Sequence, residues 1–275
     1  MTNPVRLVRD HPMLTFVSLA CLFGWSNYIA AAVGLGSDPG NRPLGPGMAA
    51  LVVVACQGRA NLATWWRQLR TWRAAPAWYA LAVLTPLAVH LTIVSINHGL
   101  GAPLPTTAQL GQWPDLPLTF VVNLVFIGIG EEAGWTAFAA PLLLSRHGLL
   151  GAWVILAGVR ILWHLPLMLT GESGWVMGFV GNAAFQLIVL LMFRASGGRW
   201  SLAAVWHATL NTFGGSFFTA MVTGADQARF GLLLSAIYAL LAITGLVLGR
   251  RDNLTRMPDP TVEATDPTTA LTTHA

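Results

Sequence analysis

The chain has 275 residues, of which 55% are hydrophobic and only 9% are charged. Ordinary soluble domains carry about 25% charged residues. This composition therefore excludes an ordinary soluble domain and indicates a polytopic membrane protein. The formal net charge is +4, but the arginines are scattered over short segments and form no dense basic patch, so no nucleic-acid partner is expected.

The pattern of apolar segments predicts an all-α membrane protein with about eight transmembrane helices in one bundle. The predicted spans are 13–36, 48–56, 77–97, 117–144, 149–169, 175–193, 202–222 and 230–248. The first is longer than the core of a secretory signal, so we expect an uncleaved span. The second is short, and even if it extends over 44–58 it can only cross a thinned region of the bilayer or lie shielded in protein. Together the spans place a membrane helical domain at 13–249, after a cytoplasmic N-terminus at 1–12.

The segment 59–73 interleaves four arginines with Trp65, Trp66 and Trp72. This pattern is typical of an amphipathic helix at the membrane surface, where membrane lipid would be its partner. An N-terminus on the inside places most arginines on one side of the membrane, as the positive-inside rule predicts for a multi-pass cell-membrane protein with both ends cytoplasmic. The last segment, 250–275, has few large apolar residues and is predicted to be a disordered cytoplasmic tail.

Glu131 and Glu132 are the only charged residues in the predicted span 117–144 and lie near its middle. A carboxylate there costs at least a few kcal/mol to insert, so intramembrane acids are rare and usually mark chemistry or a transport path. The same pattern would arise from a buried acid that pairs with an arginine on another helix and only holds the bundle together.

Further polar residues lie in two later spans. His164 lies in the fifth, where Pro166 is expected to kink the helix beside it. His207 and Asn211, in the seventh, are spaced so that their side chains leave the same helix face one turn apart. Glu131, His164 and His207 offer either the ligands of a zinc-like ion with an open position or a carboxylate base with imidazole partners. Asn211 would be a suitable hydrogen-bond donor to an oxyanion.

Three motifs carry these residues in order: EEAGW at 131–135, WHLP at 163–166 and HATLN at 207–211. They resemble the CAAX prenyl protease 2 and bacteriocin-processing family of intramembrane endopeptidases, over a motif core at about 117–215. The resemblance implies hydrolysis of a peptide bond in a membrane-anchored or lipidated, CAAX-like protein or peptide. It implies that Glu131 with His164 activates water, and that His207 with Asn211 stabilises the tetrahedral intermediate. It leaves open whether a divalent metal is required.

Two positions depart from the family pattern. Thr136 stands where the family has arginine, and Arg160 stands where it commonly has phenylalanine. Because Arg160 lies one turn before His164 on the same helix face, we predict that it supplies the missing charge from the neighbouring span and pairs with Glu132. The alternative functions are a catalytically degenerate scaffold or bacteriocin-immunity-type protein, and a proton-coupled transporter with the glutamates as a relay. The sequence does not indicate an oligomeric state.

Overall fold

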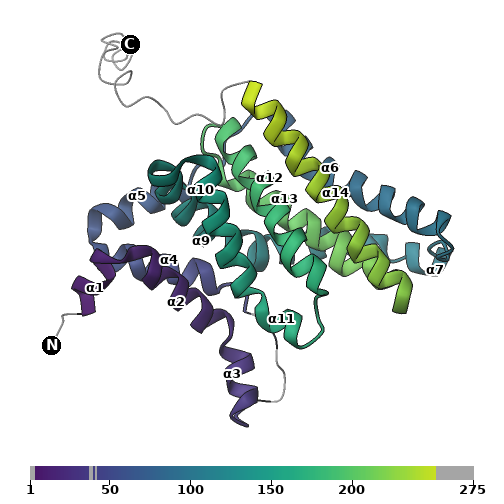
Figure 1. Ribbon diagram of the computed structural model, residues 1–275, viewed down its shortest axis with the longest axis horizontal. Helices are drawn as coiled ribbons and strands as arrows, with labels where there is room; N and C mark the ends of the chain where they lie inside the picture. The colour runs from purple at the N-terminus through teal and green to yellow at the C-terminus, as the bar shows by residue number, and fades with distance from the viewer. Residues whose placement is uncertain (1–3, 37–39, 41, 252–275) are drawn as a thin grey trace.

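The computed structural model describes residues 4–36, 40 and 42–251, and all regular structure in these residues is helical. The N-terminal helices lie on one side of the molecule, and α6 and α14 lie on the other, with the segments that carry the three motifs between them (Figure 1). The N-terminal side contains α1 Pro4–Asp10, α2 Pro12–Gly24, α3 Ser26–Ala32, α4 Gly45–Gln57 and α5 Arg59–Leu69. The opposite side contains α6 Pro76–Gly99 and α14 Gly224–Arg251.

The central segments follow one another through short connections and several π-helical turns. The first group is α7 Thr107–Leu110, η1 Trp113–Asp115, α8 Leu116–Asn123, η2 Leu124–Ile129, α9 Gly130–Gly134, η3 Trp135–Ala139 and α10 Ala140–Trp163. The second group is α11 Leu165–Leu169, η4 Met177–Gly181, α12 Asn182–Ala195, α13 Trp200–Phe213, η5 Gly214–Phe218 and η6 Thr219–Met221. The π-helical segments η2 and η3 flank α9, which carries both glutamates. Such widened turns are frequent at functional sites.

Two glycines allow the acidic helix to pack closely against its neighbours. A β carbon on Gly134 would lie 2.4 Å from the carbonyl oxygen of Pro46 in α4, and one on Gly128 would lie 2.4 Å from that of Ala204 in α13. Both distances are far below van der Waals contact, so any larger residue would push these helices apart. The glycines therefore hold the segment with the glutamates between α4 and α13.

Helix α13 is deeply enclosed in the bundle, because every residue from 200 to 210 is buried. Its polar residues His207 and Thr209 face protein, where a membrane helix can carry such groups without exposing them to lipid. Nearby, aromatic side chains pack edge to face. The ring centres of Phe16 and Trp135 lie 5.2 Å apart, and those of Trp135 and Trp163 lie 6.1 Å apart. The motif residues thus stand on a rigid core.

Among the described residues, four helical segments are long and apolar enough to cross a membrane, and α2 with α3, bent by 56°, would make a fifth. The four are Pro76–Gly99, Thr107–Trp163, Met177–Ala195 and Gly224–Gly249. They support a multi-pass membrane protein, but the eight predicted spans are not confirmed. The predicted span 117–144 and most of the span 149–169 fall within one helical run, Thr107–Trp163, which is interrupted by the non-helical backbone of Gly148 at φ 64° and ψ −173°. Helix α4 has only 13 residues, and α13 is shielded by protein.

The predicted amphipathic segment 59–73 contains α5, in which one tryptophan is buried in the protein and the next is exposed. Trp65 is 8% exposed and donates its indole N–H to the carbonyl oxygen of Ala133 over 3.1 Å, whereas Trp66 is 57% exposed. Of the predicted tail, residues 250 and 251 complete α14, and residues 252–275 lie outside the described residues. The orientation of the two termini in the membrane stays a prediction.

Candidate active site

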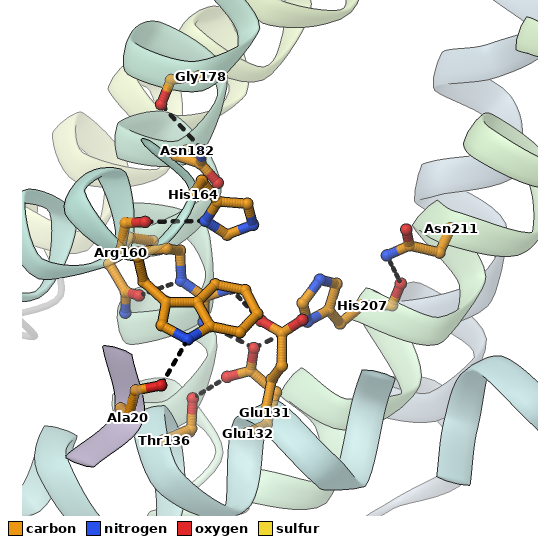
Figure 2. Close-up of polar contacts among 12 residues, drawn as sticks. Ala20, Glu131, Glu132, Thr136, Arg160, His164, Gly178, Asn182, His207 and Asn211 are labelled. Atoms are coloured by element: carbon orange, nitrogen blue, oxygen red, sulfur yellow. Dashed lines mark hydrogen bonds and ion pairs between the residues drawn. The ribbon is translucent and has the colours of Figure 1, made fainter. Parts of the chain in front are cut away.

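Three helices bring the predicted site residues together. Glu131 and Glu132 lie in α9. Arg160 lies in α10, and His164 caps its end. His207 and Asn211 lie in α13. In Figure 2 the rings of both histidines and the amide of Asn211 lie around one space, with the Glu131 carboxylate at its edge. Residues that are up to 80 positions apart in the chain therefore form one polar group, as the sequence predicts.

Glu132 is completely buried and accepts contacts from three donors. Its Oε1 lies 2.7 Å from Nη2 of Arg160 and 2.9 Å from Nδ1 of His207. Its Oε2 accepts a hydrogen bond from the hydroxyl of Thr136 over 2.5 Å. The ion pair with Arg160 is the one that the two departures from the family pattern predict. Thr136 lacks the positive charge of the arginine that the family has at this position, but its hydroxyl still binds the Glu132 carboxylate.

Arg160 is 1% exposed, and its guanidinium is held on several sides. Its Nε donates to Oε1 of Gln186 over 3.0 Å, and the group lies over the rings of Phe185 at 4.8 Å and Trp135 at 5.6 Å. A planar guanidinium with hydrogen bonds in its plane and aromatic rings on its faces is well suited to burial. Arg160 therefore serves as a fixed cation beside Glu132.

Glu131 differs from its neighbour. It is 4% exposed, yet its Oε2 has no hydrogen-bond partner among the described residues. Nη1 of Arg160 lies 3.6 Å from that oxygen, an ion pair that is longer than a hydrogen bond. Buried carboxylate oxygens nearly always have a donor. This oxygen is therefore available to accept a proton from a water molecule or a substrate group.

The two histidines direct equivalent nitrogens to the site. Nδ1 of His164 binds the carbonyl oxygen of Arg160 over 2.8 Å, and Nδ1 of His207 binds the Glu132 carboxylate. Because both partners can only accept, each Nδ1 carries a proton, and Nε2 of the neutral ring is left with a free lone pair. The ring of His207 also packs on Phe185, with 4.8 Å between the ring centres.

Indole hydrogen bonds fix the turn that carries His164. Nε1 of Trp25 donates to the carbonyl oxygen of Trp163 over 2.8 Å, and Nε1 of Trp163 donates to that of Ala20 over 3.0 Å. Helix α10 ends at Trp163 and α11 begins at Leu165, so the helix breaks at His164, as expected from Pro166. The bent pair of α2 and α3 thereby holds this histidine in place.

Asn211 contributes an amide whose donors are only partly used. Its Nδ2 donates to the carbonyl oxygen of His207, one turn earlier, over 3.1 Å. The group has two N–H donors, so the second one is free to bind a ligand. The side chain is half-buried.

The comparison with protein families agrees with this geometry. Residues 113–213 match the family model described as type II CAAX prenyl endopeptidase Rce1-like. The chain carries an Rce1-like domain. The matched segment includes all six predicted site residues and is consistent with the family resemblance of the three motifs. No curated protein matches the chain.

Within the Rce1-like domain, the expected metal ligands do not form one set. The described residues whose donor atoms lie within 4.8 Å of one another are Glu131, Glu132 and His207, and His164 is not among them. The Glu132 oxygens are occupied by three donors, and the Glu131 carboxylate lies beside the Arg160 guanidinium. A divalent cation there would meet a fixed positive charge. The predicted ligand set of Glu131, His164 and His207 is therefore not assembled in this arrangement, and the close group is Glu131, Glu132 and His207.

Three residues of the Rce1-like domain that support the site were not predicted from the sequence. These are Gln186, which binds Arg160; Phe185, which lies between Arg160 and His207; and Asn182, which Figure 2 shows near His164. Gln186 is fully buried, and a buried glutamine in an apolar helix is a signal that could have found it. Asn182, one turn earlier on α12, binds the carbonyl oxygen of Gly178 over 2.8 Å.

Proposed function

We propose that the protein is an intramembrane endopeptidase that hydrolyses a peptide bond in a membrane-anchored or lipidated, CAAX-like protein or peptide. The Rce1-like domain supports the peptidase class. The observation that carries the proposal is the unequal pair of carboxylates on α9: Glu132 has three donors, and Oε2 of Glu131 has no hydrogen bond among the described residues. The free carboxylate is the general base.

The proposed reaction begins with a water molecule bound between Glu131 and Nε2 of His164. Glu131 accepts a proton from this water as its oxygen forms a bond to the carbonyl carbon of the substrate. The free N–H of Asn211 donates to the oxyanion that develops on the carbonyl oxygen. The carbon–nitrogen bond then breaks, and the proton held by Glu131 passes to the leaving amine.

His207 also contributes to binding the oxyanion when both nitrogens of its ring carry a proton. When its ring is doubly protonated, the Nδ1 proton binds Glu132, whose charge balances the imidazolium, and the Nε2 proton is a further donor to the oxyanion. Glu132 and Arg160 thus orient His207 without touching the substrate, so both are positioning residues. This assignment differs from a metal mechanism, in which Nε2 of His207 would have to keep its lone pair.

The test is the variant Glu131→Gln, which keeps the shape of the side chain and removes the base. Purified protein in lipid vesicles is given a farnesylated peptide with a CAAX-type end, and the products are identified by mass spectrometry. We expect a loss of turnover of at least about 10²-fold, in the range typical for general bases, with unchanged thermal unfolding. The exposed carboxylate variant Glu172→Gln is the matched control and should cleave normally. Normal turnover by Glu131→Gln would refute the mechanism.

The two alternative functions give different results in the same vesicles. A degenerate scaffold would give no cleaved product with the unaltered chain, either from the peptide or from membrane peptides of cells that express it. A transporter would show uptake that depends on a pH gradient, again without product. The family match supports the peptidase, and no feature of the site specifically favours the other two.

A further inference from the structure

A cavity of about 450 Å³ lies between α4, α5, the beginning of α10 and the turn that joins α12 to α13. No proposed catalytic residue lines it, and much of its wall comes from α5, outside the segment that matches the Rce1-like family. Its size falls within the range of about 300–1,000 Å³ that is usual for small-molecule sites. The active site does not explain this cavity.

The lining divides into two kinds of wall. One wall carries amide and hydroxyl groups, and the other carries large apolar side chains. The polar wall includes Asn61, Thr64 and Gln68 of α5, and the apolar wall includes Phe138, Leu142 and Phe193. A ligand that satisfies both walls has a polar and an apolar part. This is the character of a lipid at the level of its headgroup.

The charge of the cavity favours an anion. Arg199 lines it, is partly buried, and has no hydrogen bond or ion pair from its guanidinium among the described residues. Arg67 does not line the cavity, but its Nη2 donates to the hydroxyl of Thr64, which does, over 3.0 Å. The chain has no aspartate or glutamate from residue 39 to residue 114, so no acid of α4, α5 or α6 neutralises these arginines. Phosphate groups bind well to such guanidinium groups.

We propose that this cavity binds the phosphate headgroup of an anionic phospholipid. Arg199 and the polar wall bind the phosphate and its glycerol, and the apolar wall contacts the upper part of the acyl chains. Helix α5 is suited to a position at the level of the lipid headgroups, because Trp65 is buried in the protein and Trp66 is exposed. A free phosphate ester shares the phosphate chemistry but leaves the apolar wall without a partner.

The proposed lipid would lie against the helix that carries the glutamates. Trp65 lines the cavity and binds the carbonyl oxygen of Ala133, the residue after Glu132. Ala137, beside Thr136, also lines it. The headgroup site and the active site therefore share the wall formed by α9 and η3.

Binding is measured with the full-length protein in detergent micelles. The probes are dihexanoyl phosphatidylglycerol, dihexanoyl phosphatidylcholine and glycerol 3-phosphate, and the readout is the change in tryptophan fluorescence with concentration. We expect saturable binding of phosphatidylglycerol, and a Kd weakened roughly tenfold in Arg199→Gln because a charge-assisted hydrogen bond is lost. The control Arg59→Gln alters an exposed arginine of α5 that does not line the cavity, and should bind normally.

A second variant tests the cavity without removing its charge. Thr64→Phe should fill the polar wall and abolish saturable binding while the helical content, measured by circular dichroism, stays the same. The proposal is overturned by normal binding in Thr64→Phe, by an equal loss in Arg59→Gln, or by equal binding of phosphatidylcholine. Binding of glycerol 3-phosphate as tight as that of phosphatidylglycerol would overturn the lipid assignment. None of these measurements depends on peptide cleavage, so they remain valid if the proposed function fails.

Discussion

The two halves of the candidate site differ in how completely their polar atoms are bound. Around Glu132, the guanidinium of Arg160, the hydroxyl of Thr136 and Nδ1 of His207 all bind one buried carboxylate. Around Glu131, one carboxylate oxygen and Nε2 of both histidines have no hydrogen bond among the described residues. The first half is a fixed network, and the second presents reactive atoms to a common space.

This difference teaches how two adjacent glutamates can have separate roles. Successive residues of a helix point in different directions, so Glu132 faces Arg160 while Glu131 lies at the edge of the open half (Figure 2). A fully bound network fixes its members in one geometry. The rigid half can therefore hold His207 in position for chemistry in the other half. A substitution in one half should therefore change the other half as well.

The largest effect on stability is expected from Arg160→Phe, which restores the common family residue. It leaves Glu132 buried without its cation, at a cost of about 3–5 kcal/mol in the free energy of unfolding. Thermal unfolding in detergent measures the loss, and His207 should lose its fixed position, so that turnover falls as well. A harmless Arg160→Phe would mean that Glu132 does not depend on this cation.

The double variant sharpens this result. Thr136→Arg alone adds a second buried cation and should also be poorly tolerated. Because the hydroxyl of Thr136 already binds Oε2 of Glu132, an arginine at this position can reach the same carboxylate. Thr136→Arg combined with Arg160→Phe should recover much of the stability. A double variant no better than the worse single one would refute the relocation of charge between α9 and α10.

The next effect concerns the open half. Asn211→Ala should lower kcat by about 10²- to 10³-fold, the usual cost of removing one oxyanion donor, with little change in KM or stability. Asn211→Asp keeps the shape but replaces the donor by an acceptor, and it should lose as much. Full activity in Asn211→Asp would show that the amide donates nothing to the transition state.

Much of the site was predictable because acids and histidines are rare in apolar helices. Glu131, His164 and His207 stand out by type alone, and two departures from a family pattern were enough to pair Arg160 with Glu132. The hydrogen bond from Thr136 was not predicted, because a threonine in place of arginine indicates only a missing charge. Gln186 was missed because its role depends on which helix lies beside α10, and a local pattern does not contain this information.

The fold was predicted less completely than the site. The all-helical class follows from apolar segments of membrane-spanning length, but hydropathy cannot tell a helix that faces lipid from one that faces protein. Helix α13 is covered on all sides, so it can carry His207 and still lie within the bundle. Helix α4 is short, and its Pro46 packs closely against Gly134. The helix is therefore supported by protein and does not cross a bilayer alone. The count of eight is not confirmed because of such buried segments.

A smaller effect is expected where the N-terminal helices support His164. Trp25→Phe keeps an aromatic side chain but removes the N–H that donates to the carbonyl oxygen of Trp163. The loss should be about 1 kcal/mol in the free energy of unfolding, the usual contribution of one hydrogen bond, with a modest fall in turnover as His164 gains freedom. Trp175→Phe, an exposed tryptophan outside the site, is the control and should change neither.

The smallest effect is expected from removing metal. The Glu132 oxygens are occupied, His164 lies outside the close group of donors, and Nη1 of Arg160 is 3.6 Å from the free oxygen of Glu131. A divalent ion at that oxygen would be repelled by a guanidinium that α10 holds in place. Dialysis against a strong chelator should therefore leave turnover unchanged, and elemental analysis of active protein should find well below one zinc-like ion per chain. Loss of activity on chelation, with recovery on adding zinc, would contradict this. Glu131, His164 and His207 would then have to close around the ion, and Arg160 would have to move away from Glu131.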